Sequence, residues 1–192
     1  MRKFSRIVLF LLFTFQFSAA QCGKYKWDVK TGSDWQGEIP IATYWSISAL
    51  AGLPIPKTSQ KRLKKTVEGS VISVSAELVE YKREPDGDYH LILTDGIQFL
   101  VAEIPDPYCA QTSRFHDLIA DARAGFESLD YNLQPSTRFK TTHIAVSITG
   151  LGFIDKSHGA KAAAPNGLEI HPVIAFEFLD PPPLPPRRFL CR

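Results

Sequence analysis

Alternating apolar and polar residues predict β-strands in this chain from about residue 67 onward. In the first strand, one face carries the apolar residues Ile72, Val74, Ala76 and Leu78, and the other carries Ser73, Ser75, Glu77 and Tyr81. The same pattern predicts strands at residues 89–94, 99–104, 143–149 and 168–179. In the last of these, the two faces are Leu168, Ile170, Ile174 and Phe176 against Glu169, His171 and Glu177.

Turn residues separate the first three strands. Residues 85–88 (Pro-Asp-Gly-Asp) form a turn, because Pro fixes φ and Gly accepts a positive φ. Asp95-Gly96 is a pair typical of tight hairpins. The sequence Pro-Asp-Pro at 105–107 ends the third strand, since Pro cannot donate to a sheet. The first three strands are therefore predicted to be antiparallel neighbours.

A helix is predicted at residues 113–129, after the third strand. Its apolar residues follow the spacing of one helical stripe: Phe115, Leu118, Ile119, Ala122, Phe126 and Leu129. Thr112 or Ser113 can cap its N-terminus. In the fourth strand, Gly150 and Gly152 indicate a bulge or a close approach of two backbones.

Three antiparallel strands, a helix and two further strands are the element order of the OB-fold, a five-stranded barrel. We therefore expect a mainly β (α+β) protein, an OB-like barrel with one helix between strands three and four. The barrel is expected at 67–179, between an extended N-terminal arm at 21–66 and a Pro-rich tail at 180–192. The arm holds three residues that we expect to pack onto the core, Trp27, Trp35 and Trp45. It also holds a basic cluster that we expect to be solvated: Lys57, Lys61, Arg62, Lys64 and Lys65.

Residues 1–20 have the layout of a signal peptide. Three basic residues precede the apolar stretch 7–17, and Ser-Ala-Ala at 18–20 provides the small residues needed for cleavage before Gln21. The apolar stretch is shorter than the roughly 20 residues of a membrane-spanning helix, and no later segment is long and apolar enough. We expect export to the periplasm or the extracellular space. Acylation of Cys22 as a lipoprotein is an alternative, although Gln21 stands where such signals favour a small residue.

Charge and cysteine content narrow the possibilities further. The chain has 22 basic and 20 acidic residues, but three basic residues lie in the leader, which leaves a net charge of about −1. A generic binder of polyanions usually has a basic domain, so there is no strong nucleic-acid signature. In an oxidising compartment, Cys22, Cys109 and Cys191 allow one disulfide. We prefer Cys22–Cys191, which would join the chain ends, and the other pairings stay open.

Histidines and acidic residues near the predicted strands are the candidates for a functional site. We select His90, His158, Glu169 and His171 as catalytic or binding residues, since Glu169 and His171 leave the same face of one strand. Supporting positions around them are Asp88, Glu103, Asp155 and Asn166. His90, His158 and His171 could bind a divalent metal such as Zn²⁺, and an imidazole with a carboxylate could also form an acid–base pair. Alternatively, these groups satisfy one another at a bent end of the barrel.

The other two histidines are less suited to a site. His143 begins the fourth strand, and His116 lies on the helix away from the apolar stripe, where we expect it to face solvent.

Five segments resemble a widespread family of uncharacterised exported bacterial proteins. They are residues 26–32 (KWDVKTG), 88–91 (DYHL), 103–107 (EIPDP), 150–153 (GLGF) and 164–173 (APNGLEIHPV), and the similarity covers about residues 24–178. The family's His-Gly loop and Glu-x-His-Pro strand are matched by His158-Gly159 and by Glu169 and His171. The resemblance implies a shared fold and site and names no substrate.

Thermonuclease-like barrels offer a more distant analogy, because they are also exported and OB-like. That family uses two arginines, acidic residues and calcium, and Arg83, Arg114 and Arg123 do not match its arrangement. The analogy therefore extends to the fold alone.

The preferred function is an exported OB-like domain that binds a small polar ligand or a partner at a His/Glu-lined end of the barrel. One alternative is a metal-dependent hydrolase, for example of phosphodiesters. Another is a structural envelope protein that makes contacts through its Trp-rich arm and its Pro-rich tail, which would be a polyproline II segment.

Overall fold

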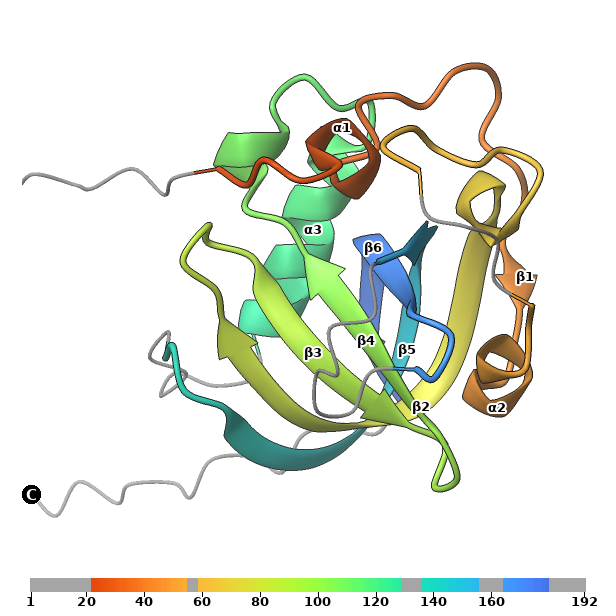
Figure 1. Ribbon diagram of the computed structural model, residues 1–192. Coiled ribbons are helices and arrows are strands. Elements are labelled where there is room, and N and C mark those ends of the chain that lie inside the picture. Colours follow the sequence, from red (N-terminus) through yellow and green to blue (C-terminus); the bar gives the residue numbers. More distant parts are fainter. Residues whose placement is uncertain (1–21, 55–58, 129–135, 156–163, 180–192) are drawn as a thin grey trace, which may run out of the picture.

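The computed structural model describes residues 22–54, 59–128, 136–155 and 164–179 of the chain. Within this part of the chain, the strands form one mixed sheet of six. They are β1 (Thr43–Tyr44), β2 (Val71–Arg83), β3 (Tyr89–Thr94), β4 (Phe99–Ile104), β5 (Lys140–Ile154) and β6 (Leu168–Phe178). Their order is β1-β2-β3-β4-β6-β5, and an additional pairing of β2 with β5 closes a ring of five strands (Figure 1).

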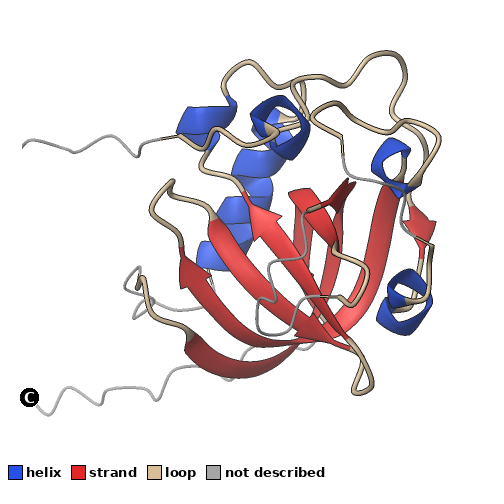
Figure 2. Ribbon diagram, in the orientation of Figure 1, coloured by secondary structure: helices blue, strands red, loops and turns tan. Residues whose placement is uncertain are grey.

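This ring has the strand order of an OB-fold. β4 runs parallel to β6, while the other neighbours in the ring are antiparallel. In the sequence, the helix α3 (His116–Glu127) comes between β4 and β5, the third and fourth strands of the ring. In Figure 2 it is the longest of the blue helices and lies beside the red strands. Its residues Ala122 and Phe126 belong to the main hydrophobic core. The predicted mainly β, OB-like barrel is therefore confirmed.

A bulge in β2 corrects the predicted position of Tyr81. The alternation places Tyr81 on the polar face, but the side chain is 7% exposed and packs edge-on against Phe126 at 5.4 Å. The pairing of β2 shifts between Leu78 and Glu80, so one extra residue is inserted there. Because side chains alternate along a strand, this insertion turns Tyr81 into the core.

The helix α3 begins at His116 rather than at Ser113. The Ser113 hydroxyl accepts a hydrogen bond from the backbone N–H of Phe115 (3.0 Å) and donates one to the carbonyl oxygen of Thr31 (2.6 Å). Leu118, which the pattern assigns to the apolar stripe, is 42% exposed, so that assignment is wrong. Among the described residues, the stripe that packs onto the barrel consists of Phe115, Ile119, Ala122 and Phe126, and Leu129 lies outside them.

The N-terminal part is not simply an extended arm. It contains the helices α1 (Trp27–Lys30) and α2 (Ile47–Ala51). Beyond it, 3₁₀ helices are found at Val67–Gly69 and Pro107–Ala110. All three tryptophans are half-buried. Trp45 packs on the main core and Trp35 against Phe115, as expected, whereas the Trp27 ring N–H donates to the carbonyl oxygen of Cys109 (3.2 Å).

The disulfide of the described chain joins Cys22 to Cys109, not to Cys191. It attaches the start of the N-terminal segment to the 3₁₀ helix after β4. Cys191 lies outside the described residues. The preference for a bond between the chain ends is therefore wrong, because the fold brings Cys22 next to a residue in the middle of the sequence.

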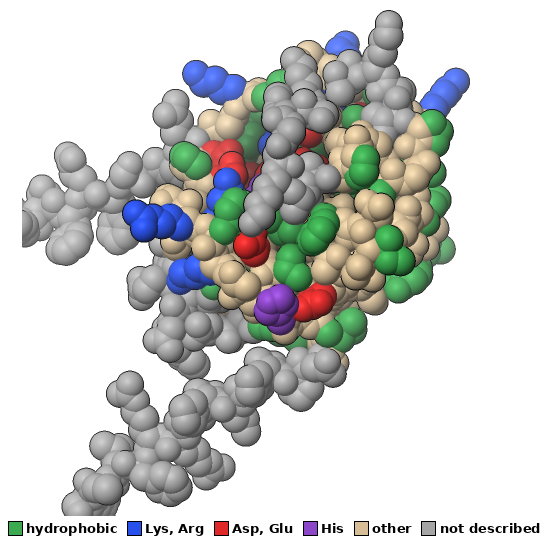
Figure 3. Space-filling view, turned by 60° about the horizontal axis from the view of Figure 1, so that its bottom comes forward, with side chains coloured by type: hydrophobic (Ala, Val, Ile, Leu, Met, Phe, Trp, Pro, Cys, Tyr) green, Lys and Arg blue, Asp and Glu red, His purple; other side chains and the backbone are tan. Residues whose placement is uncertain are grey.

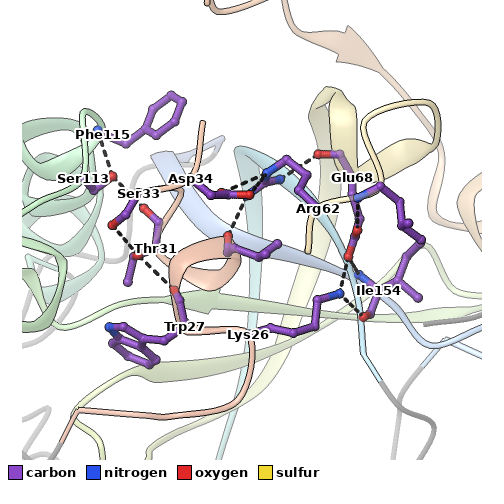
Figure 4. Close-up of polar contacts among 12 residues, drawn as sticks. Lys26, Trp27, Thr31, Ser33, Asp34, Arg62, Glu68, Ser113, Phe115 and Ile154 are labelled. Carbon is purple, nitrogen blue, oxygen red and sulfur yellow. Dashed lines mark hydrogen bonds and ion pairs between the residues drawn. The ribbon is translucent and has the colours of Figure 1, made fainter. Parts of the chain in front are cut away.

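A buried ion pair fixes α1 on the barrel (Figure 4). Lys26 Nζ lies 2.5 Å from Glu68 Oε1, and both side chains are completely buried. Lys26 also donates to the carbonyl oxygen of Ile154 (2.9 Å). Glu68 accepts from the backbone N–H groups of Leu63 (2.7 Å) and Ile154 (3.0 Å). Both charges are therefore paired and hydrogen-bonded, as burial requires.

Arg62 extends this network to the other side of α1. Its guanidinium pairs with Asp34 at 3.1 Å and donates to the carbonyl oxygens of Glu68 and Val29, each at 2.7 Å. Arg62 is 7% exposed, which corrects its assignment to a solvated basic face. Lys61, Lys64 and Lys65 are exposed as expected, and Lys57 lies outside the described residues.

We expect Lys26→Met to lower the free energy of unfolding by about 3–5 kcal/mol, because it leaves the Glu68 carboxylate buried without its cation. Chemical denaturation at pH 7 would measure the loss. The double variant Lys26→Met/Glu68→Gln should recover part of it, and Lys24→Met at an exposed position should stay within about 0.5 kcal/mol of wild type. A loss below about 1 kcal/mol in the single variant would contradict the structural role of the pair.

The close backbone approach predicted at the glycines of β5 generates a second test. A Cβ on Gly152 would collide with the carbonyl group of Val67, which is backbone and cannot move aside. Gly152→Ala should therefore destabilise the protein by at least about 2 kcal/mol in the same assay. Gly52→Ala is the matched control, since its Cβ would meet only ordinary contacts at 3.5 and 3.6 Å; a similar loss there would refute the argument.

Candidate functional site

The outer wall of the barrel carries four of the predicted site residues. Along β3, β4 and β6, Leu91, Ala102 and Ile170 point into the main core. Their sequence neighbours therefore point outward, because side chains alternate along a strand. The outward side chains are His90 on β3, Glu103 on β4, and Glu169 and His171 on β6. The expected location at an end of the barrel is thus corrected to its outer wall.

Glu103 lies at the centre of this group. Its Oε1 is 2.8 Å from Nδ1 of His90, which is its directly paired residue on β3. Its Oε2 lies 2.9 Å from Nδ1 of His171 and 3.4 Å from Nζ of Lys30. The carboxylate is 7% exposed and His171 is completely buried.

Asp88 faces the other ring nitrogen of His171. Its Oδ1 accepts a hydrogen bond from the backbone N–H of Asp106 (2.9 Å), and its Oδ2 lies 3.6 Å from His171 Nε2. Among the described residues, neither Oδ2 nor either ring nitrogen of His171 has a partner with hydrogen-bond geometry. These polar atoms are fully buried, which makes their lack of hydrogen bonds unusual.

The helix α1 covers the site. It supplies Lys30, and Lys26 directly precedes its first residue. Lys26 Nζ lies 4.5 Å and Lys30 Nζ 5.5 Å from the centre of the Phe153 ring. Phe153 in turn contacts the ring of His171 at 5.5 Å and is paired in register with Glu169. The network of Lys26, Glu68 and Arg62 therefore also holds the cover of the site.

Burial and neighbouring charges shift the pKa values of the site in opposite directions. Burial acts to raise the pKa of Glu103, but His171, His90 and Lys30 outweigh it and hold that pKa well below its usual range. For Glu169, burial and then the carboxylates of Glu103 and Asp155 raise the pKa to about 8. At neutral pH, Glu103 is therefore ionised and Glu169 protonated.

The same acidic residues also shift the pKa values of the basic residues in the site. Burial acts to lower the pKa of His171, but Glu103 outweighs it and the pKa is raised. The pKa of Lys30 is raised as well, because four carboxyl groups around it, led by Glu103, outweigh its burial.

Two supporting residues have other partners or positions. Asn166 donates to the carbonyl oxygens of Leu50 (2.8 Å) and Leu53 (3.1 Å), so its side chain fixes the end of α2 instead of entering the site. Asp155 follows β5, is half-buried, and acts on Glu169 through its charge. His158 lies outside the described residues.

The predicted metal ligands are also regrouped. In the described chain, two sets of three residues could hold a metal ion: Asp88, Glu103 and His171, and Glu84, His90 and Glu103. Within each set, the donor atoms all lie within 4.8 Å of one another. His90 and His171 therefore fall in different sets and approach opposite oxygens of Glu103. His158 lies outside the described residues, so the combination of three histidines stays a prediction, while each described set holds one histidine with two acids.

Sequence reasoning did not find Lys30, Phe153 and Glu84. Lys30 is 73 positions from Glu103, and no spacing in the sequence connects them. The remaining histidines lie elsewhere: His143 is exposed within β5 and contacts Glu77 at 2.6 Å, and β5 begins before it, so it does not start the strand. His116 begins α3 and contacts Asp117 at 2.9 Å.

Two of the arginines considered for the thermonuclease analogy have protein partners in the described chain. Basic and acidic side chains are interspersed on the face shown in Figure 3. Arg83 pairs with Asp106, while Arg123 is buried and donates to the carbonyl oxygen of Gly87. In the described part of the chain, no helix has the length and apolar character to cross a bilayer.

Comparison with known proteins yields structural neighbours of low similarity. No protein-family profile and no curated protein matches the chain. An asparaginyl-tRNA synthetase from Entamoeba histolytica aligns with a TM-score of 0.45 and 14% identity, over 76% of this chain and 25% of that one. A protein assigned as an aspartyl-tRNA synthetase from Leishmania major Friedlin aligns with a TM-score of 0.44 and 10% identity, over 76% and 22%. This chain thus spans about a quarter of their length, and its function is argued from its own residues.

The raised pKa of Glu169 predicts a pH-dependent stability. Because the folded protein holds this proton up to about pH 8 and the unfolded chain loses it near its ordinary value, wild-type stability should fall as the pH rises between these values. Glu169→Gln stays neutral and should lack the contribution of Glu169 to this pH dependence, which amounts to on the order of a few kcal/mol in the free energy of unfolding at pH 8. Denaturation between pH 5 and 8 in the presence of a chelator would measure it.

The exposed Glu177 on the same strand provides the control. Glu177→Gln should follow the wild-type profile. Parallel pH profiles for wild type and Glu169→Gln would show that Glu169 titrates normally.

Proposed function

We propose that this protein is an exported OB-like domain that binds a small polar ligand on the outer wall of its barrel, beneath α1. The observation that carries this proposal is the burial of several ionisable groups in one place. Asp88, Glu103, Glu169 and His171 are each at most 9% exposed, and Lys30 reaches them from α1.

Such a group of buried charges is costly for folding alone. Replacing buried ion pairs with apolar residues often leaves a protein equally stable or more stable. Perturbed ionisable groups also concentrate at functional sites. Elsewhere on the outer wall, His143 and Glu77 form an exposed pair, so their charges remain solvated.

The position of the group supports ligand binding as well. OB-folds bind their ligands on the face of their second and third strands and on the loops that precede strand two and strand five. In this protein these strands are β3 and β4, which carry His90 and Glu103. Asp88 ends the loop before β3, and Glu169 follows the loop before β6.

A hydrolase is the second candidate. The pair formed by His171 and Glu103 at 2.9 Å is one that general acid–base catalysis uses. However, the His171 ring is 0% exposed, so a substrate atom could not reach it in this conformation. A ligand small enough to be enclosed beneath α1 could still contact the ring, so burial favours binding of a small ligand over proton transfer to a larger substrate.

Export is the other part of the proposal, and it rests on the leader-like residues 1–20. A disulfide between Cys22 and Cys109 is consistent with an oxidising compartment. When the full chain is produced in a bacterial host, we expect it outside the cytoplasm with Gln21 as its first residue, as determined by intact-mass measurement. An uncleaved protein in the cytoplasm would refute this.

Native mass spectrometry of the exported protein would test ligand binding. We expect an additional bound mass on wild type and on the matched control His143→Gln, and its loss in His171→Gln, with folding checked by circular dichroism. A thermal-shift screen of inorganic ions, small organic acids and sugars would cover ligands lost in purification. The proposal is wrong if wild type carries no ligand and no compound raises its melting temperature more than that of His171→Gln.

A further inference from the structure

In the described part of the chain, three buried polar atoms without hydrogen-bond partners gather around His171. Asp88 Oδ2 and both ring nitrogens of His171 are buried without hydrogen-bond partners in the described chain. Buried polar atoms of this kind are rare unless something binds them. They also converge, since the donor atoms of Asp88, Glu103 and His171 all lie within 4.8 Å of one another.

We propose that Asp88, Glu103 and His171 bind a divalent transition-metal ion. This inference rests on the proposed function, because it names the ligand class of the same site. Two carboxylates and one imidazole are ligands typical of Zn²⁺ and of related first-row ions, whereas Ca²⁺ and Mg²⁺ prefer oxygen alone.

The distance between Asp88 and His171 fits a shared metal ion better than a hydrogen bond. Asp88 Oδ2 and His171 Nε2 are 3.6 Å apart, which is too long for direct bonding between them. Two ligands that each lie about 2.1 Å from a tetrahedral Zn²⁺ are separated by about 3.4 Å. A small shift of these two side chains would therefore place them on one ion.

Two alternatives to a bound metal ion explain the site less well: a protonated His171 and a bound water molecule. A protonated His171 would donate to both acids, but neither of its nitrogens has hydrogen-bond geometry towards them. A water molecule could bridge the atoms but would bring no positive charge. Within the described residues, His171 is the one ion-pair partner of the Asp88 carboxylate, and Lys30 acts on it only through its charge from farther away, so a bound cation satisfies it better.

The neighbouring residues have the roles expected around a bound metal. Asp88 is oriented by the Asp106 backbone N–H through Oδ1, which leaves Oδ2 for the ion. Glu103 is oriented by His90 through Oε1, which leaves Oε2 on the side of His171. Hydrogen bonds to the second oxygen of a ligating carboxylate are a common feature of metal sites.

The test uses the full chain exported from its host, stripped with a chelator and titrated with Zn²⁺ by calorimetry, with bound metal counted by elemental analysis. We expect one ion per chain for wild type. His143→Gln removes the exposed pair of His143 and Glu77, so it controls for binding at the surface and should also bind one ion per chain. Asp88→Asn keeps the carbonyl oxygen that binds Asp106 and should lower the affinity at least about tenfold.

A second variant locates the ion. Glu84→Gln changes the alternative set of donors and should leave the affinity within about twofold of wild type. If Glu84→Gln weakens binding and Asp88→Asn does not, the ion lies beside His90 and the assignment is wrong. Equal binding by all variants would likewise overturn it.

Co²⁺ provides a measurement that does not depend on the variants. Visible absorption of Co²⁺-loaded wild type should indicate a low-coordinate site with nitrogen and oxygen ligands. If wild type binds neither Zn²⁺ nor Co²⁺ while native mass spectrometry still detects a ligand that His171→Gln loses, the metal inference fails and the proposed function stands. If no ligand of any kind is found, both fail.

Discussion

The buried ion pair between Lys26 and Glu68 is the interaction on which the rest of the site depends. It joins α1 to the barrel across 42 positions of sequence, and both partners are fully removed from water. Such a pair is stable only when every remaining donor and acceptor is satisfied. Here the backbone groups of Ile154 and Leu63 complete it, so the ends of α1 and β5 are fixed relative to each other.

Because α1 is held in this way, the outer wall of the barrel becomes a buried environment. Without α1, residues such as Glu103 and Glu169 would be solvated side chains on an ordinary sheet surface. Under α1, the same carboxyl groups lose water and their charges act on one another at short range. One carboxylate stays ionised with the histidines and Lys30, and its neighbour keeps a proton to about pH 8. The disulfide between Cys22 and Cys109 attaches the chain just before α1 to the same region.

The barrel itself explains why these residues meet. Pairing of β3 with β4 places His90 beside Glu103, and the parallel pairing of β4 with β6 brings Glu169 and His171 to the same wall. The positions are set by rigid strands instead of loops, which gives them a defined geometry. The site is therefore a property of the closed ring and its cover together.

Local sequence determined the strands, the turns and the OB-like order, because alternation of side chains and turn chemistry act over a few residues. It also identified Glu169 and His171 as neighbours, since they are two residues apart on one strand. Tertiary structure alone decided the rest. A one-residue bulge in β2 places Tyr81 in the core, and Leu118 is exposed instead of packed on the barrel. Cys22 forms its disulfide with Cys109. Lys30 joined Glu103 because α1 docks on the outer wall, and such long-range contacts leave no spacing in the sequence from which they could be predicted.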